Sequence, residues 1–312
     1  MACGSAGARC PGPALELAEL APGVWQAVAD AGSLDANAAN RGFVANLLAV
    51  RDGPRLWLLG SGPSPAFGRR LACQLRARAG VPVSDVVDPW PRPELVLGNR
   101  AFPGARRWAH ADVAAAMQSR CPRCVARLQG LLGDAAGDLG AAPIQLPTRL
   151  LYGESGRLGP FLWWRLQRAP QVPVTVWRLD IPTAAPLWAA PGLLWAEGAP
   201  DLRDAELATM RRSTAALRAI SAADGEAARW LPEQGPLLAA DAPARHAAYW
   251  EALDATVEAA LERGALEVDV PATLPAAPAL PAAMTRGERH ALNWQRAWRE
   301  VERRWMGTPE AQ

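Results

Sequence analysis

The chain alternates between short apolar runs that stop at glycine or proline turns and longer segments with apolar residues at helical spacing. In the first third, the runs 43–50 and 55–59 are separated by Asp52-Gly53, a dipeptide typical of hairpin turns, and a helical segment follows at 65–79. Further strand-like runs lie at 83–87, 107–110, 144–152, 161–166, 174–179, 187–188, 193–196 and 229–231, and further helical segments at 111–132, 201–220, 243–263 and 286–305. This order predicts a layered α/β (α+β) fold with two groups of strands, each covered by helices.

The 312 residues are enough for one large domain with a complete hydrophobic core. We divide the chain into a flexible N-terminal tail (1–14), a main domain (15–270), an Ala/Pro-rich spacer (271–285) and a C-terminal helix that packs on the domain (286–312).

All 33 basic residues are arginine, and they balance 31 acidic residues to a net charge of +2 without any long basic run. We therefore expect no nucleic-acid partner. The absence of lysine excludes Schiff-base chemistry and a P-loop lysine. No apolar run reaches the ~20 residues that span a bilayer, so we expect a soluble protein. The first residues lack the apolar region of a secretory signal, which predicts a cytoplasmic protein, or a periplasmic one if the true start lies upstream and encodes a signal peptide.

The chain has only three histidines, His110, His246 and His290, so a site built from several histidines is excluded. His110 ends a strand-like run, whereas the other two fall in predicted helices. We expect surface or capping positions for His246 and His290.

Cys121 and Cys124 form a CxxC pair, which is compatible with half of a zinc site, a disulfide or two reduced thiols. A closed zinc site needs two more ligands, and the candidates are Cys3 and Cys10 in the predicted tail. Reduced thiols are the favoured interpretation, and the sequence leaves the three states open.

Several motifs occur in an order that resembles a known family. They are Leu20-Ala-Pro-Gly-Val-Trp25, then Asn40-Arg-Gly-Phe-Val-Ala-Asn46, then Leu59-Gly-Ser-Gly-Pro-Ser64, and then Leu97-Gly-Asn-Arg-Ala-Phe102. The chain resembles the metallo-β-lactamase fold, and within it the zinc metallohydrolases associated with bacterial quinoprotein systems. The resemblance implies a four-layer αβ/βα sandwich.

In that family an HxHxDH motif binds zinc and precedes the LGNxAF-like segment. The positions that the resemblance matches to metal-site residues are Trp90, Arg92, Glu94 and Leu95, Gly198 in Leu193–Gly198, and Gln234 in Trp230–Pro236. The expected central histidine falls near Leu179–Pro182, where there is none. Tryptophan and leucine supply no metal ligand, and Arg92 places a cation where one must bind. We expect no metal and no other cofactor.

The resemblance and the altered motif together predict a non-catalytic protein that retains the scaffold and acts as a binding or accessory module. Its partner would be an active relative or a quinoprotein dehydrogenase system. The alternative is a hydrolase that acts on a small substrate by metal-independent chemistry.

Two further interpretations concern the same region. Arg92 and Glu94 either form an ion pair that fills the vacated pocket, which we favour, or contact an anion together with Asn99. Most of the 14 tryptophans are expected in the core, and an exposed aromatic patch is the less favoured alternative.

Overall fold

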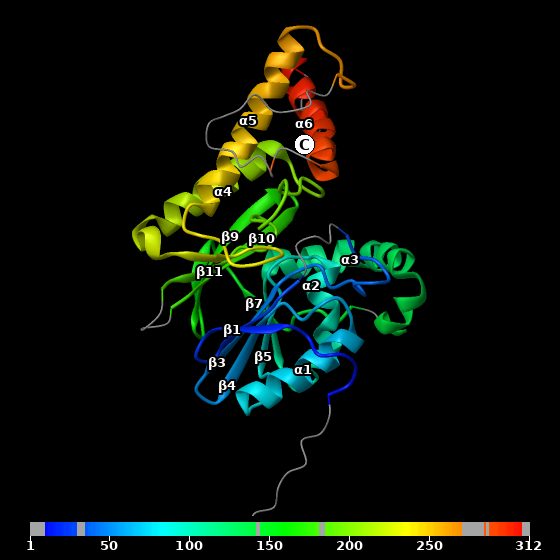
Figure 1. Cartoon of the computed structure of the whole chain (residues 1–312), viewed down its shortest axis with the longest axis vertical. Helices are drawn as coiled ribbons and strands as arrows, with labels where there is room; N and C mark the ends of the chain where they lie inside the picture. Colours follow the sequence, from blue (N-terminus) through cyan, green and yellow to red (C-terminus); the bar gives the residue numbers. More distant parts are fainter. Residues whose placement is uncertain are drawn as a thin grey trace, which may run out of the picture.

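The computed structural model describes residues 10–29, 35–141, 144–180, 185–269, 284 and 287–307. Its strands form two sheets, and helices accompany each of them (Figure 1). The sheets and helices follow the alternation of segments in the sequence, so the predicted fold class is confirmed.

The first sheet has seven strands in sequence order. They are β1 (Leu17–Ala21), β2 (Val24–Ala27), β3 (Leu47–Asp52), β4 (Arg55–Leu59), β5 (Asp85–Val87), β6 (Arg106–His110) and β7 (Arg149–Leu151). The strands β1 to β4 pair antiparallel, with Asp52 opposite Arg55 across the predicted hairpin turn. The strands β4 to β7 pair parallel, because a helix or a longer connection returns the chain between them.

The second sheet has five strands. Their order is β12 (Arg229–Leu231), β11 (Leu187–Ala189), β10 (Val172–Leu179), β9 (Phe161–Ala169) and β8 (Ser155–Leu158). β8 was not predicted from the sequence. The run 193–196 was predicted as a strand and is a turn and loop, because Leu193 and Leu194 donate backbone hydrogen bonds back to the Ala190 carbonyl.

Helices flank both sheets (Figure 1). With the first sheet lie α1 (Pro65–Ala79), α2 (Pro93–Val96), the 3-10 helix η1 (Leu97–Ala101), α3 (Ala111–Leu132) and the 3-10 helix η2 (Gly133–Leu139). With the second lie α4 (Leu207–Ser221), the 3-10 helix η3 (Ala222–Ala227), α5 (Ala242–Glu262) and α6 (Glu288–Trp305). No helix among the described residues combines the length and the apolar character needed to cross a membrane.

Aromatic side chains join the two sheets face to face. Trp57 of β4 lies edge-on to Phe161 of β9 with ring centroids 6.3 Å apart, and Phe161 contacts Trp177 of β10 at 5.8 Å in the same manner. All three side chains are buried, and edge-to-face contacts add about 0.5–1.5 kcal/mol each to their burial. Trp163, Trp188 and Trp195 are also buried, whereas Trp164 is partly buried and Trp305 is exposed. The expectation that most of the tryptophans lie in the core is confirmed.

Two sequence motifs meet at the start of α1 and at η1. Ser64 accepts a hydrogen bond from the Phe67 amide (3.1 Å) and caps α1. The Gly98 amide donates to the Gly62 carbonyl (2.9 Å), and a Cβ at Gly98 would lie 1.9 Å from the Ser61 oxygen. Only glycine therefore allows η1 to pack directly on the turn after β4.

A disulfide joins Cys10 to Cys73 of α1 and closes a loop across 63 positions of the sequence. This disulfide was not predicted from the sequence, in which Cys10 was a candidate only for a zinc ligand in the tail. Cys121 and Cys124 are free thiols. Cys10 is used in the disulfide and is therefore not available to these two thiols as a zinc ligand. The described part of the predicted tail is thereby held against α1.

Three segments named in the sequence analysis fall wholly or partly outside the described residues, and the first is the tail, which is described only from Cys10. The spacer 271–285 contains one described residue, Met284, and the central position 179–182 is described only to Asp180. The helix predicted after the spacer is α6, which lies beside α5 (Figure 1).

Candidate functional site

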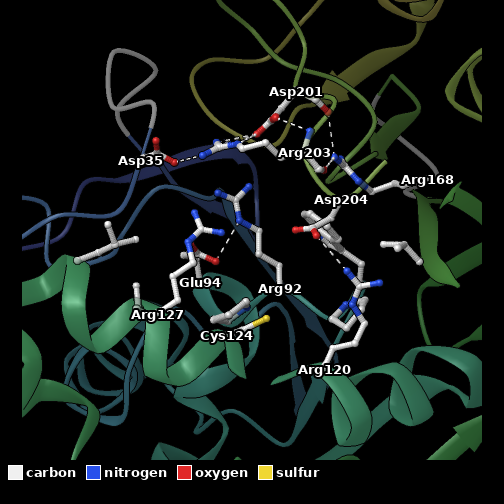
Figure 2. Close-up of a pocket in the computed structure, with 16 residues that line it drawn as sticks. Asp35, Arg92, Glu94, Arg120, Cys124, Arg127, Arg168, Asp201, Arg203 and Asp204 are labelled. Atoms are coloured by element: carbon white, nitrogen blue, oxygen red, sulfur yellow. Dashed lines mark hydrogen bonds and ion pairs between the residues drawn. The ribbon is translucent and has the colours of Figure 1, made fainter. Parts of the chain in front are cut away.

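A cavity of about 70 Å³ opens between the start of α2, one face of α3 and the loop that leads to α4 (Figure 2). Its volume is that of a few water molecules or a small ion. Its charged lining consists of five arginines and four carboxylates, namely Arg92, Arg120, Arg127, Arg168, Arg203, Asp35, Glu94, Asp201 and Asp204.

Prolines position Arg92 in this cavity. Pro89, Pro91 and Pro93 alternate with other residues after β5, and a residue that precedes proline is restricted to extended backbone. Arg92 accordingly has φ −102° and ψ 126°, and α2 starts at Pro93, which needs no amide donor at that position. The segment therefore stays extended up to Arg92 and becomes helical only after it.

Arg92 is held by two carboxylates. Its Nε donates to Glu94 Oε2 (3.1 Å) and its Nη1 donates to Glu233 Oε1. The side chains of Arg92 and Glu94 are each 12% exposed and that of Glu233 is fully buried. Burial alone lowers the pKa of Arg92, but the charges of Glu233 and Glu94 outweigh this and raise it above its usual value. Arg92 is a permanent cation.

Backbone contacts fix Glu233 in the loop after β12. Its amide donates to the Leu194 carbonyl (2.7 Å), and its carbonyl accepts from the Asn46 amide (2.7 Å). Its second carboxylate oxygen accepts from the Gly192 amide (2.7 Å). Both carboxylate oxygens are therefore used. Glu233 connects the start of α2 to the loop after β11, and its backbone carbonyl binds the segment just before β3 of the first sheet.

Arg168 is a buried cation with backbone carbonyls as its partners. Its guanidinium donates to the carbonyls of Gly192, Asp201 (2.9 Å) and Arg203 (2.7 Å). It also lies 4.6 Å from the centroid of the Trp90 ring. Burial lowers its pKa to about 10, although the charges of Asp201 and Glu233 oppose the change. Arg168 stays charged at neutral pH and orders the loop before α4.

Ion pairs occupy the rim of the cavity. Arg203 donates to Asp201 Oδ2 (2.8 Å through Nε) and to Asp35, and Arg120 pairs with Asp204 (3.1 Å). Burial tends to raise the pKa of Asp201, but the hydrogen bonds from Arg203 hold it at about 2. Asp201 is therefore ionised at neutral pH, and all three carboxylates are engaged in ion pairs (Figure 2).

The structure brings three of the seven predicted site residues together. Trp90, Arg92 and Glu94 line the cavity, and Arg92 and Glu94 form the ion pair that the sequence favoured. The other four lie outside the lining: Leu95, Gly198, Gln234 and Asn99. Leu95 is buried and uses its carbonyl to accept from the Ser61 amide (2.6 Å), so it is part of the packing around η1.

Asn99 does not contact the cavity, contrary to its predicted role beside Arg92. Its Nδ2 donates to Asp88 Oδ2 (2.9 Å) and to the Gln145 carbonyl (3.0 Å). Asp88 and Asn99 are both fully buried, and the Oδ1 atom of each has no partner among the described residues. Burial raises the pKa of Asp88 to about 7, with the Asn99 hydrogen bond and the charge of Arg107 acting in the opposite direction.

Glu233 and Arg168 were not predicted from the sequence as site residues. Glu233 directly precedes Gln234 in the motif Trp230–Pro236, and this proximity was the one available signal. Arg168 lies in a strand far from every motif, and a buried strand arginine has no distinctive pattern.

The residues at this site do not fit a metal ion. Trp90 and Leu95 have no ligand atom, and Arg92 already supplies a positive charge to the two carboxylates that point toward it. Within the described ranges, no group of three or more His, Cys, Asp or Glu side chains is placed to hold a metal.

None of the three histidines lines the cavity, and all three are buried. The prediction of surface or capping positions is wrong for His246 and His290. His246 accepts from the Trp195 amide (2.9 Å) and lies 2.8 Å from the Ala242 carbonyl, and burial lowers its pKa to about 4. His290 contacts the Tyr249 hydroxyl (2.9 Å) at the junction of α5 and α6.

His110 is the histidine that caps a helix. Its Nδ1 accepts from the Asp112 amide (3.2 Å) at the start of α3.

The cysteine pair lies on α3 beside the cavity. Cys121 is fully buried and Cys124 is half-buried and lines the cavity. Burial raises the pKa of both thiols, to about 12 for Cys121, so both are protonated at neutral pH. Neither has the features of a nucleophilic thiolate.

No protein-family model and no curated protein matches the chain. Solved structures do match. The metallo-β-lactamase FIM-1 of Pseudomonas aeruginosa in its mono-zinc form has a TM-score of 0.58 and 16% identity, over 76% of this chain and 95% of its own. The chain has the metallo-β-lactamase fold.

Two more structures support this conclusion. The metallo-β-lactamase of Hirschia baltica has a TM-score of 0.56 and 11% identity, over 76% of this chain and 97% of its own. That of Erythrobacter litoralis has a TM-score of 0.54 and 17% identity, over 76% of this chain and 96% of its own. The similarity establishes the backbone architecture, whereas function depends on the residues at the site.

We predict that Glu233→Gln lowers the free energy of unfolding by about 2–4 kcal/mol, because it removes a buried carboxylate from Arg92. Urea denaturation followed by tryptophan fluorescence measures the change. Glu154→Gln is the control, since Glu154 is 80% exposed and its ion pair with Arg165 contributes less than about 0.5 kcal/mol. Equal losses in the two variants would contradict the role given to Glu233.

A second prediction concerns Asp88, whose pKa is about 7 in the folded chain against 3.8 ordinarily. Between these values the unfolded chain loses the proton and the folded chain keeps it, so stability falls as pH rises from about 4 to about 7, by on the order of 3 kcal/mol. Asp88→Asn removes this loss, because an amide keeps an oxygen that accepts from Asn99 Nδ2 and does not titrate.

The measurement is urea denaturation of both proteins from pH 4.5 to pH 8. We expect the free energy of unfolding of Asp88→Asn to be close to that of the parent at pH 4.5 and to be larger than that of the parent at pH 8. Asp52→Asn, at an exposed hairpin position, controls for the loss of one charge. A parallel pH dependence in the parent and Asp88→Asn would show that Asp88 is ionised in the folded chain.

Proposed function

We propose that the protein is a metallo-β-lactamase-fold pseudoenzyme, which has lost its metal site and acts as a binding or accessory module. The observation that carries the proposal is the Arg92 guanidinium, held between Glu94 and Glu233. By the sequence resemblance, Arg92 stands at a histidine of the metal motif, and Glu233 precedes the position of another.

Electrostatics makes this arrangement incompatible with a metal centre. Two unit positive charges 4 Å apart repel by about 4 kcal/mol at the effective dielectric constant typical near a protein surface, and a divalent ion doubles this. Both oxygens of Glu233 are already used by Arg92 and the Gly192 amide. The guanidinium therefore takes over the function of connecting the two motif segments, and no metal-activated water is available as a nucleophile.

The proposed partner rests on the sequence resemblance alone. It supports an association with a quinoprotein alcohol-oxidation system, through an active relative or a dehydrogenase as the partner.

We further propose that the protein works in an oxidising compartment such as the periplasm. The Cys10–Cys73 disulfide supports this, because disulfides persist in such compartments and are rare in the reducing cytosol.

Metal analysis tests the main proposal. The full chain, purified without chelator, is examined by plasma mass spectrometry for zinc and iron and assayed with chromogenic β-lactam and ester substrates. We expect less than ~0.1 equivalent of metal and no turnover above the uncatalysed rate, because no metal centre can form.

An active metallo-β-lactamase handled in the same way is the positive control. One or two equivalents of tightly bound metal would overturn the proposal. Turnover that survives chelator and disappears in the double variant Arg92→Ala/Glu94→Ala would instead support the metal-independent hydrolase.

Thiol trapping tests the compartment. Cells that produce the protein from its native gene are quenched with an alkylating reagent, and peptide mass spectrometry follows. We expect Cys10 and Cys73 to be recovered as a disulfide-linked pair and Cys124 as an alkylated thiol. Alkylation of Cys10 and Cys73 before reduction would contradict the proposal.

A further inference from the structure

Several donors at the cavity have no acceptor among the described residues. Arg92 uses Nε and Nη1, and its Nη2 has no hydrogen bond within the described ranges. Trp90 Nε1 and Arg168 Nε are buried and also lack a partner in the described part of the chain. Buried donors in native proteins are nearly always satisfied, so an acceptor from outside the described residues is expected here, and a bound ligand would supply it.

Arg127 adds an uncommitted positive charge. It lies on the face of α3 that lines the cavity, three residues after Cys124, and its side chain points to the same space as Arg92 (Figure 2). It is exposed and forms no hydrogen bond or ion pair with any described residue. Neighbouring Arg120 is already paired with Asp204.

The carboxylates of the cavity, by contrast, are all engaged. Glu94 accepts from Arg92, Asp201 and Asp35 accept from Arg203, and Asp204 accepts from Arg120. The free hydrogen-bonding capacity of the cavity therefore lies in donors, which selects an anion over a cation.

Part of the cavity lining is apolar. It consists of Pro93 of α2, Leu128 and Leu131 of α3 and Val172 of β10, and we refer to these side chains together as the apolar wall. An inorganic ion gains nothing from such a wall, whereas a short hydrocarbon group does. The volume of about 70 Å³ restricts the enclosed part of the ligand to a few heavy atoms.

We propose that the cavity binds a small organic carboxylate. The carboxylate group of this ligand faces Arg92 and Arg127, and the short apolar tail of the ligand lies against the apolar wall. The inference rests on the proposed non-catalytic function, because the ligand uses a cavity whose centre is a guanidinium and not a metal ion.

Calorimetric titration of the full chain with sodium butyrate, at constant ionic strength, tests the inference. We expect saturable binding at one site, a change in tryptophan fluorescence through Trp90, and at least tenfold weaker binding of butyramide, which has the same shape without the charge. Inorganic phosphate should bind more weakly than butyrate, because it makes no use of the apolar wall.

Two arginines of α3 provide a matched pair of variants. Arg127→Ala should weaken butyrate binding about three- to tenfold, as expected for a partly exposed guanidinium–carboxylate contact. Arg123→Ala should leave binding within about twofold, because Arg123 is exposed on the same helix and does not line the cavity. Both residues are exposed, so neither substitution disturbs the core, and circular dichroism verifies this.

Three results would overturn the inference: no saturable butyrate binding, equal binding of butyramide, or equal weakening by the two variants. Tighter binding of phosphate than of butyrate would also overturn it, since the apolar wall would then have no role. Each of these results, obtained with metal-free protein, is compatible with the proposed loss of the metal site. Bound zinc or iron in the same preparation would instead reject the proposed function itself.

Discussion

The ion pair between Arg92 and Glu233 is the interaction on which the cavity depends. It joins α2, which follows the first sheet, to the loop after β12 in the second half of the molecule. The Glu233 carboxylate also accepts from the Gly192 amide, and the Glu233 backbone shares hydrogen bonds with Asn46 and Leu194. This one residue therefore fixes the loop after β11 and the segment before β3 relative to each other. Removal of Arg92 leaves the buried Glu233 carboxylate without its cation, and removal of Glu233 leaves Arg92 with Glu94 alone, so either loss is costly.

Backbone chemistry places these charges. The alternating prolines keep the chain extended up to Arg92, and Gly98 lets η1 lie directly on the turn at Ser61. Gly192 has φ +78°, and a side chain there would crowd Trp90 and Arg168. The cavity is thus built from positions where the backbone is restricted by proline or requires glycine. A metal centre would demand convergent imidazoles, whereas a guanidinium needs only two carboxylates within reach.

Local signals predicted much of the fold. The Asp52-Gly53 turn gave the β3–β4 hairpin, and helical periodicity with a flanking proline or capping residue gave α1 and α3 with their observed bounds. The run 193–196 misled because it is apolar and buried without belonging to a sheet: its backbone is used by the turn at Ala190 and by Glu233. The buried positions of His246 and His290 were equally hidden, since their partners are distant in sequence.

The sequence by itself determined that this chain has no set of histidines for a metal site, that strands and helices alternate in layers, and that Trp90, Arg92 and Glu94 share one segment. Only the tertiary structure decided what Arg92 does there. Glu233 lies 141 positions later in the chain, and Arg168 meets its carbonyl partners across a separate loop. Long-range pairing of charges depends on how the two sheets pack, and no local pattern of residues encodes it.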